Sequence, residues 1–335
     1  GTPLVLNEYD LGHKADAINT GAVKIALDAA REFSTPEWPR FVAGAMGPTT
    51  KTLSVTGGIS FEELEENFYQ QAKALIEAGA DLILLETSQD MLNVKAGTIA
   101  VHRAFTELGK EIPVMISGTI EPMGTTLAGQ SIEAFYISIE HIKPLSVGLN
   151  CATGPEFMTD HLRSLAELST GYISCYPNAG LPDEEGCYHE TPDSLSKKLQ
   201  GFAEKGWLNI VGGCCGTTPA HIAAIRAAVD GYAPRQPKEA THGHVVSGIE
   251  PLQYDDSMRP LFIGERTNVI GSRKFKNLIV DGKFEEAAEI ARAQVKNGAH
   301  VIDICLANPD RDEVEDMKNF MQEVVKKVKV PLVID

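Results

Sequence analysis

Amphipathic helices alternate with short apolar strands from residue 11 to residue 230, and this alternation predicts an α/β fold built as a TIM-type (β/α)8 barrel. Two observations favour a barrel over a doubly wound sheet. The strand and helix units are about 30 to 40 residues long, which implies right-handed crossovers between parallel strands. Nearly every strand also ends in small, polar or reactive residues, whereas a doubly wound sheet concentrates its functional residues at one switch point.

Six apolar segments are expected to form the strands of this barrel. Eight strands are needed for closure, so we expect the barrel to be N-terminally incomplete, with its first two strands upstream of Gly1. The chain is therefore expected to be a fragment of a longer protein. The six segments are "RFVAGAM" (40–46), "DLILLET" (81–87), "IPVMISGT" (112–119), "LSVGLNC" (145–151), "YISCYPN" (172–178) and "LNIVGGC" (208–214).

The helices between these strands carry recognisable start and stop signals. Ser60 and Glu63 form a capping-box pattern at the start of a helix, and Gly79 is placed to end it. Within that helix Leu64, Phe68, Ala72 and Leu75 form one apolar stripe. Similarly, Thr218 followed by Pro219 predicts the N-cap and first turn of the last helix before residue 230.

A second, shorter series of the same units follows a linker. Residues 231–258 are rich in Pro, Gly and charge and lack sustained periodicity, as an interdomain linker does. Strands are then predicted at "RPLFIGERTN", "HVIDICL" and "VPLVID", with helices over 284–297 and 313–327. Residues 72–86 align with residues 291–305 without a gap. We therefore expect residues 259–335 to be the first strands and helices of a second TIM-type barrel.

Composition limits the partners of this chain. The 30 Lys and Arg against 46 Asp and Glu give a net charge of −16, which argues against nucleic acid and anionic membrane surfaces. No run approaches the roughly 18 apolar residues of a membrane span. Six cysteines are too few for a disulfide framework, and no secretory leader is present. A reduced, cytoplasmic protein is expected.

Three cysteines predict a metal site. Cys214 and Cys215 follow the last strand between glycines, and Cys151 ends another strand at the same predicted face. Taken alone, an adjacent pair of cysteines is as well explained by buried thiols that act as small hydrophobes. Three thiolates at one barrel mouth, however, suit tetrahedral Zn(II) with one open position. Such a site is a poor source of hydroxide but can hold a substrate thiol deprotonated, so the pattern predicts S-alkylation.

The motifs around these cysteines resemble a known family. "GLNCATGP" and, about sixty residues later, "VGGCCGTTPAHI" resemble the homocysteine-binding zinc barrel of the homocysteine methyltransferases, and residues 1–230 as a whole are similar to that module. The resemblance implies that Cys151, Cys214 and Cys215 are zinc ligands and catalytic residues. The homocysteine contacts that it implies are Glu86, which receives the amino group, together with Asn150 and Gly118.

The second region carries its own resemblance. "SGIEPL" in the linker and "FIGERTNVIGSRKF" resemble the junction and first strand of the pterin-binding domain in cobalamin-dependent methionine synthases. This implies that Asn268, Asp303 and Asp335 contact the pterin ring of 5-methyltetrahydrofolate at the ends of three strands. Cys305 stands where most members have asparagine, so that role passes to Asn308 or to water, or is lost.

The resemblance implies a methyltransferase that converts zinc-activated homocysteine to methionine with methylcobalamin, which 5-methyltetrahydrofolate recharges. An Asp-x-His-x-x-Gly cobalamin motif is absent, so cobalamin-binding and reactivation domains are expected outside this chain. The fragment alone is expected to be inactive. Two rivals stay open, namely a cobalamin-free homocysteine S-methyltransferase and a non-catalytic zinc-binding module with four protein ligands.

Overall fold

The computed structural model describes residues 1–239 and 243–335, and the chain divides into two compact units, residues 1–241 and 242–335. The boundary falls inside the segment predicted as a linker, of which residues 240–242 lie outside the described residues. None of the helices described for this chain combines the length and the apolar character that a bilayer-spanning segment needs. Each unit is built around a parallel sheet.

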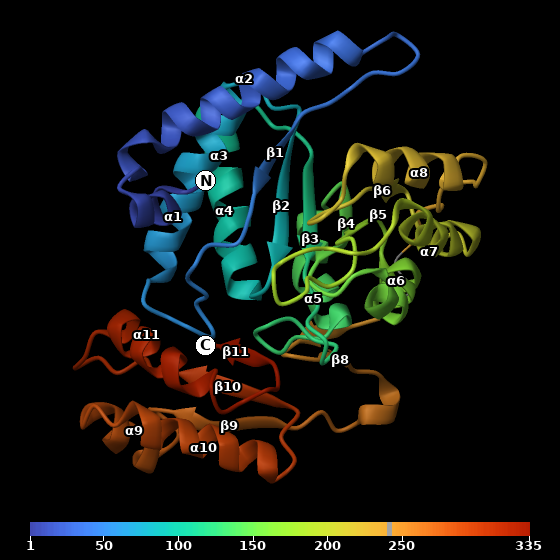
Figure 1. Cartoon of the computed structure of the whole chain (residues 1–335). Helices are drawn as coiled ribbons and strands as arrows, with labels where there is room; N and C mark the ends of the chain where they lie inside the picture. The colour runs from blue at the N-terminus through green and yellow to red at the C-terminus, as the bar shows by residue number, and fades with distance from the viewer. Residues whose placement is uncertain (240–242) are drawn as a thin grey trace. The chain divides into compact units, whose positions relative to one another are not determined.

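The first unit contains a six-stranded parallel sheet whose strands pair in sequence order, from β1 to β6 (Figure 1). All six predicted strands are confirmed, and the order without a reversal is that of a barrel wall and not of a doubly wound sheet. Among the described residues β1 and β6 do not pair with each other, so the sheet is open. The strands are Ala43–Met46 (β1), Leu82–Ser88 (β2), Val114–Gly118 (β3), Ser146–Cys151 (β4), Tyr172–Pro177 (β5) and Ile210–Val211 (β6).

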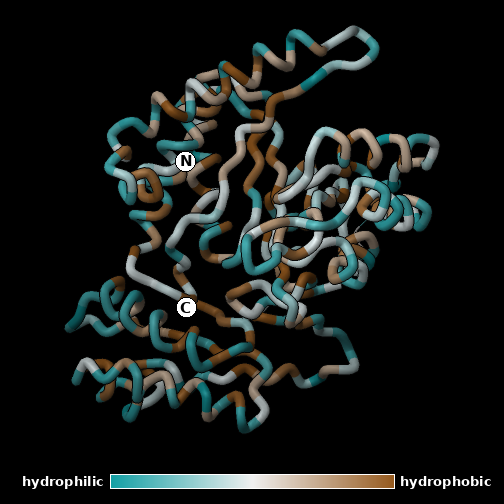
Figure 2. The backbone as a smooth tube through the Cα atoms, viewed as in Figure 1, coloured by the Kyte–Doolittle hydropathy of each residue, from teal (hydrophilic) through white to brown (hydrophobic). Residues whose placement is uncertain are grey.

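Alternate strand residues face the helices and form the core of this unit. Ile83, Ile116 and Leu149 are fully buried there, and the apolar colour runs through the central strands in Figure 2. The opposite, inward face of the sheet carries polar residues instead, such as Ser117, Asn150 and Ser174. The inward face is therefore the side of the sheet whose polar side chains could bind a ligand or take part in a reaction.

Two α-helices of the first unit precede β1, and one α-helix follows each of its six strands. The capping box at Ser60 is present and Gly79 adopts a left-handed φ of 99° just past the helix end, as predicted. Thr218 and Pro219 likewise start the last helix. The helices are Pro3–Leu6 (α1), Ala15–Phe33 (α2), Phe61–Glu77 (α3), Met91–Leu108 (α4), Ile132–Ile139 (α5), Pro155–Leu168 (α6), Pro192–Glu204 (α7) and Pro219–Val229 (α8), with 3₁₀ turns at Asn7–Tyr9 (η1), Gly12–Lys14 (η2) and Glu140–Ile142 (η3).

The second unit contains a three-stranded parallel sheet in the order β11, β10, β9, which confirms the three predicted strands. It also contains a helix and a short antiparallel hairpin that the periodicity of the sequence did not reveal. The elements are Val245–Ser247 (β7), Pro251–Gln253 (β8), Asp256–Met258 (η4), Ile263–Asn268 (β9), Arg273–Val280 (α9), Phe284–Lys296 (α10), Val301–Cys305 (β10), Glu313–Val324 (α11) and Leu332–Ile334 (β11).

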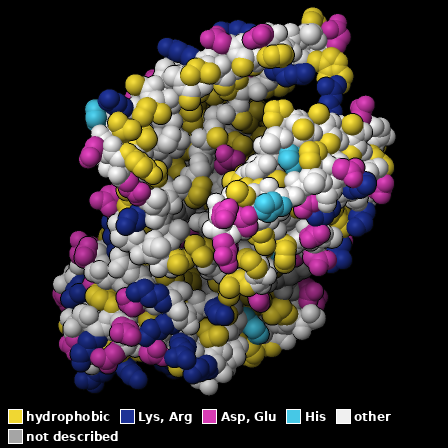
Figure 3. All heavy atoms as spheres, viewed as in Figure 1, with side chains coloured by type: hydrophobic (Ala, Val, Ile, Leu, Met, Phe, Trp, Pro, Cys, Tyr) yellow, Lys and Arg dark blue, Asp and Glu magenta, His cyan; other side chains and the backbone are white. Residues whose placement is uncertain are grey.

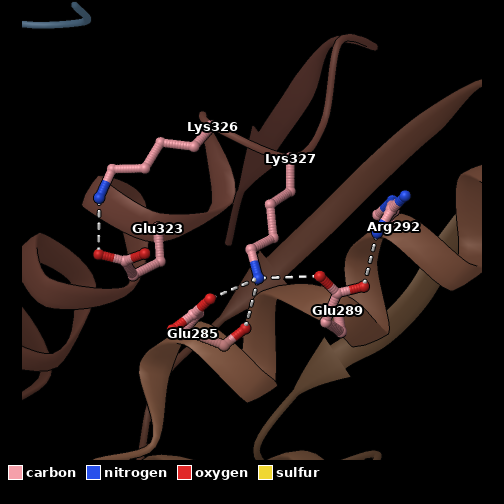
Figure 4. Close-up of polar contacts among 6 residues, drawn as sticks. All are labelled: Glu285, Glu289, Arg292, Glu323, Lys326 and Lys327. Carbon is pink, nitrogen blue, oxygen red and sulfur yellow. Dashed lines mark hydrogen bonds and ion pairs between the residues drawn. The ribbon is translucent and has the colours of Figure 1, made fainter.

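The core of the second unit lies between this sheet and its helices. Phe275 of α9 and Phe320 of α11 meet edge to face with ring centroids 5.1 Å apart, beside Ile302 and Ile304 of β10. Outside the core, Lys327 follows α11 and forms ion pairs with Glu285 and Glu289 of α10 (Figure 4). The Nζ atom of Lys327 is 2.8 Å from the Oε1 atom of Glu289. Charged side chains of both signs are interspersed over the face formed by α9, α10 and α11 (Figure 3).

Candidate metal centre and its surroundings

Three cysteine sulfurs from two strand ends lie together in the first unit. The Sγ atom of Cys215 is 4.0 Å from that of Cys151 and 3.9 Å from that of Cys214, and all three lie within 4.8 Å of one another. A tetrahedral zinc ion with Zn–S bonds of about 2.3 Å holds its sulfur ligands about 3.8 Å apart. The spacing of the three thiols therefore suits one zinc ion, which would have a fourth position for another ligand.

Backbone hydrogen bonds to the end of β5 place Cys214 and Cys215. The amide of Cys214 donates to the carbonyl of Pro177 at 2.8 Å, and the carbonyl of Cys215 accepts from Ala179 at 2.9 Å. Gly213 is needed because a Cβ atom there would lie 2.4 Å from the Thr217 side chain. Gly216 has a φ of 77°. The glycines around the pair thus allow the tight path that directs both sulfurs to one point.

Cys151 is held in a backbone conformation that non-glycine residues rarely adopt. Its φ is 65° and that of Ala152 is 48°, so the chain turns sharply at the end of β4. Residues other than glycine seldom adopt the left-handed backbone conformation, and those that do are found often at functional sites. The turn directs the Cys151 sulfur toward Cys214 and Cys215.

The three thiols share protons unequally. A hydrogen bond from Cys214 lowers the pKa of Cys151 to about 5, although burial opposes the shift. The same hydrogen bond, followed by burial, raises the pKa of Cys214 above its ordinary value. One thiolate is therefore available near neutral pH, and metal binding must displace the protons that remain.

The Asn150 side chain connects three strand ends. Its Oδ1 atom accepts from the Thr87 amide at 2.9 Å and from the Ser117 hydroxyl at 2.7 Å. Its Nδ2 atom donates to the Thr87 hydroxyl at 2.8 Å and lies 3.8 Å from the Cys214 sulfur. Asn150 is fully buried, and its amide is engaged on both sides. The residue predicted to contact the substrate thus orients Cys214.

Glu86 points to the inward face because strand residues alternate, and β2 becomes irregular directly after it. The pairing of β2 with β3 shifts between Leu85 and Ser88, and Thr87 has a φ of 56°. Burial raises the pKa of Glu86, the Tyr176 hydroxyl opposes this, and the Cys151 charge adds to it. Glu86 also lines a pocket with Met46 and Asn93. The carboxylate is therefore half-buried beside the thiols and not a solvated surface acid.

Gly118, the third predicted homocysteine contact, ends β3. A Cβ atom at this position would lie 3.0 Å from the Phe135 ring of α5, so the missing side chain is explained by packing toward the helix layer. A contact of Gly118 with a substrate would have to come from its backbone.

Three residues that the sequence did not single out border the site. Asn178 accepts from the Cys215 amide at 3.1 Å and donates to the Ala152 carbonyl at 3.3 Å, so it joins the two thiol-bearing turns. Tyr188 packs on Gly216, where a Cβ atom would lie 2.3 Å from its ring. Tyr176 faces Glu86 from β5. "YPNAG" beside a predicted strand end was the only signal for two of them.

The remaining cysteines of the first unit lie away from the cluster. Cys175 is fully buried in the core near Met158, and burial raises its pKa. Cys187 is exposed in the loop after β5. Neither joins the group of potential metal ligands. Cys175 therefore packs in the core, and Cys187 faces solvent.

In the second unit the predicted pterin contacts lie on neighbouring strands, Asn268 and Asp335 at strand ends but Asp303 in the middle of β10 and not at its end as predicted. Asn268 ends β9, where its Oδ1 atom accepts from the amides of Ile270 and Gly271, both at 2.8 Å. Asp303 lies within β10, and burial, followed by the charges of Asp335 and Glu265, raises its pKa. The carboxylates of Asp303, Asp335 and Glu265 therefore lie near one another.

The substituted position in this region is buried. Cys305 pairs with Asn268 in the parallel ladder and is only 4% exposed. Asn308, one of the candidates for the missing asparagine role, is also buried, and its Oδ1 atom accepts from the Asp310 amide at 3.3 Å. The side-chain oxygen of Asn308 thus accepts a hydrogen bond within its own turn.

Comparison with known proteins assigns the two regions separately. Residues 1–229 match the family described as homocysteine S-methyltransferase. Residues 264–335 match the family described as pterin binding enzyme. The first match contains all three clustered cysteines and Glu86, and the second contains Asn268, Asp303 and Asp335.

Solved structures share the fold of the first unit. The apo form of the homocysteine methyltransferase MmuM from Escherichia coli is 24% identical over 64% of this chain and 75% of its own, with a TM-score of 0.53. Its oxidized and metallated forms are each 23% identical over 68% of this chain and 75% of their own, with TM-scores of 0.56. At this identity the likeness shows a common fold.

Proposed function

This chain belongs to the homocysteine S-methyltransferase family, and from that premise we propose that it binds homocysteine through a metal ion and positions the substrate sulfur to accept a methyl group. The observation that carries the proposal is the cluster of Cys151, Cys214 and Cys215, whose spacing suits one tetrahedral zinc ion. A zinc ion held there would leave one position for the homocysteine thiol and keep that thiol deprotonated at neutral pH.

The residues of the chain then have distinct tasks. The three cysteines hold the ion, Asn150 orients Cys214, and Glu86 binds the ammonium group of homocysteine. During transfer the homocysteine sulfur forms a bond to the methyl carbon while the bond from that carbon to its donor breaks, and the electron pair of the broken bond stays on the donor. Positioning and thiol activation therefore supply the catalysis, without acid or base hydrolysis.

The proposed methyl donor is methylcobalamin, recharged from 5-methyltetrahydrofolate. The match of residues 264–335 to pterin binding enzymes supports a folate site in the same chain as the homocysteine site. Asn268, Asp303 and Asp335 are the proposed pterin contacts, because carboxylate and amide oxygens accept the donors of a pterin ring. Since the cobalamin motif is absent from the sequence, a separate domain would present the cobalamin.

We further propose how the two units fit complete domains. The six-stranded open sheet would be six strands of an eight-stranded homocysteine barrel over residues 1–230, and residues 231–258 would link it to the next domain. The three-stranded sheet in residues 259–335 would be the start of a pterin-binding barrel. With both barrels partial and cobalamin on another domain, the chain alone is expected to bind homocysteine without turnover.

Zinc content and X-ray absorption at the metal, measured before and after addition of homocysteine, test the proposed function. One zinc per chain with three sulfur ligands that become four supports it, and Cys214→Ala should lose the metal. A non-catalytic zinc module predicts four protein ligands and no change with homocysteine. Assays of methylcobalamin, S-methylmethionine and betaine as donors, with the complete enzyme, separate the cobalamin-dependent reaction from the cobalamin-free rival.

A further inference from the structure

One buried hydroxyl beside the metal centre has no hydrogen-bond partner. Among the described residues, four buried side-chain oxygens lack a partner, namely those of Ser146, Thr153, Ser174 and Tyr176. Buried polar groups are almost always paired, so each exception calls for an explanation. Tyr176 differs from the others because its hydroxyl lies near the Ser117 hydroxyl, the Glu86 carboxylate and the Cys214 sulfur.

The position of Tyr176 in the sheet explains what it can reach. Tyr176 lies on β5 opposite Asn150 on β4. Gly212 is also next to Tyr176, because a Cβ atom added to Gly212 would lie 3.3 Å from the Cβ atom of Tyr176. The Ser117 hydroxyl, which also lies near Tyr176, donates to Asn150 at 2.7 Å. Glu86 is the carboxylate that lies near the Tyr176 hydroxyl.

The Tyr176 hydroxyl has unused hydrogen-bonding sites. Burial, above all, raises the pKa of Tyr176, so the group is a neutral phenol with one donor and two acceptor sites. It lies close enough to Glu86 to lower the pKa of that carboxyl, yet it makes no hydrogen bond of normal geometry. A small shift toward Glu86 satisfies the donor, but the acceptor sites then still lack a partner.

We infer that Tyr176 completes the substrate's ammonium site together with Glu86: its hydroxyl donates to the Glu86 carboxylate and accepts an N–H from the α-ammonium group of homocysteine. The inference rests on the proposed function and adds a specificity residue to it. The pair selects thiols that carry a primary amine at the distance found in homocysteine. A thiol that carries only a carboxylate leaves the Tyr176 acceptor sites empty and meets the negative charge of Glu86.

Two analogues of homocysteine test which end of the substrate Tyr176 recognises. 3-Aminopropanethiol keeps the amine and lacks the carboxylate, whereas 4-mercaptobutyrate keeps the carboxylate and lacks the amine. Binding of homocysteine and both analogues to the zinc-loaded full chain is measured by calorimetry for the wild type and Tyr176→Phe. Tyr172→Phe is the matched control, because Tyr172 starts the same strand and is 43% exposed.

Tyr176→Phe is expected to weaken homocysteine and 3-aminopropanethiol roughly tenfold and to leave 4-mercaptobutyrate unchanged. Tyr176→His, which keeps a donor and an acceptor, is expected to restore part of the difference. Because the hydroxyl is unpartnered, Tyr176→Phe is also expected to leave the zinc content and the melting temperature of the substrate-free protein unchanged or slightly raised.

Equal weakening of all three thiols, or no weakening of any, overturns the inference, because a purely structural tyrosine does not distinguish the analogues. The control Tyr172→Phe should match the wild type throughout. Failure of the proposed function looks different: the wild type itself would hold zinc and bind no homocysteine.

Discussion

The helix and strand that end in β2 (residues 72–86) and those that end in β10 (residues 291–305) are built alike, but their inward-facing residues differ. In both, a helix ends before a left-handed glycine, Gly79 with a φ of 99° and Gly298 with a φ of 96°. In both, the outward strand residues, represented by Ile83 and Ile302, are fully buried in the core.

The likeness extends to the side chain that precedes each strand. Asp81 accepts from the Val42 amide at 2.7 Å, and His300 accepts from the Phe262 amide at 3.1 Å, so each ties its strand to the preceding one. The inward-facing residues are not alike, because Glu86 in the first segment aligns with Cys305 in the second. Outward residues thus specify the shared scaffold, while inward residues specify the chemistry of each site.

The largest expected effect breaks the first site alone. Cys214→Ala removes one of three proposed protein ligands, and zinc affinity is expected to fall roughly a thousandfold. Zinc content after dialysis against a chelator series measures it. Cys305→Ala, in the second unit, is expected to leave zinc content unchanged, and so is the exposed Cys187→Ala. Retention of stoichiometric zinc by Cys214→Ala contradicts the assignment of the ligand.

A second prediction concerns the protons of the same cluster. Because its pKa is lowered to about 5, Cys151 is expected to be a thiolate above that pH and to lose this form as the pH falls through it. Alkylation of the zinc-free protein, followed by peptide mass spectrometry, should show Cys151 reacting half-maximally near pH 5. Cys151→Ser removes this phase. A half-maximum near the ordinary thiol value of about 8.5 argues against the hydrogen bond from Cys214.

The third prediction tests the shared scaffold. Ile83→Ala and Ile302→Ala each leave a cavity at a fully buried outward position, and each is expected to lower the free energy of unfolding by about 2 to 5 kcal/mol. Denaturant unfolding monitored by circular dichroism measures both. Ile25→Ala on α2, where the side chain is 74% exposed, is the control and should change stability by less than about 0.5 kcal/mol. A cost at only one position means that the two cores are not equivalent.

The smallest expected effect lies at the helix starts, where the two units differ. Ser60 caps α3 by accepting from the Glu63 amide at 3.2 Å, while Glu63 accepts from the Ser60 amide at 2.9 Å. Lys283 starts α10 with no side-chain cap. Ser60→Ala is therefore expected to cost about 1 kcal/mol in thermal unfolding, and Lys283→Ala close to nothing. Equal costs at both positions remove this difference between the units.

Much of the scaffold could be predicted because its signals are local. Apolar alternation located all six strands of the first sheet and all three of the second, and the capping residues located the start of α3. The short α9 and the hairpin of β7 and β8 were missed, because segments of a few residues lie below the length at which periodicity is informative.

The site could be predicted only in part. The sequence by itself determined which residue types stand at the strand ends, including Cys151, Cys214 and Cys215, since strand position follows from local pattern. Only the tertiary structure decided that the Cys151 sulfur lies 4.0 Å from that of Cys215, sixty-four residues further along the chain. It also decided that Asn150 is fully engaged while the Tyr176 hydroxyl is not. These outcomes depend on strand register and on left-handed turns at Thr87 and Cys151, which arise from contacts between distant segments and leave no periodic signal in the sequence.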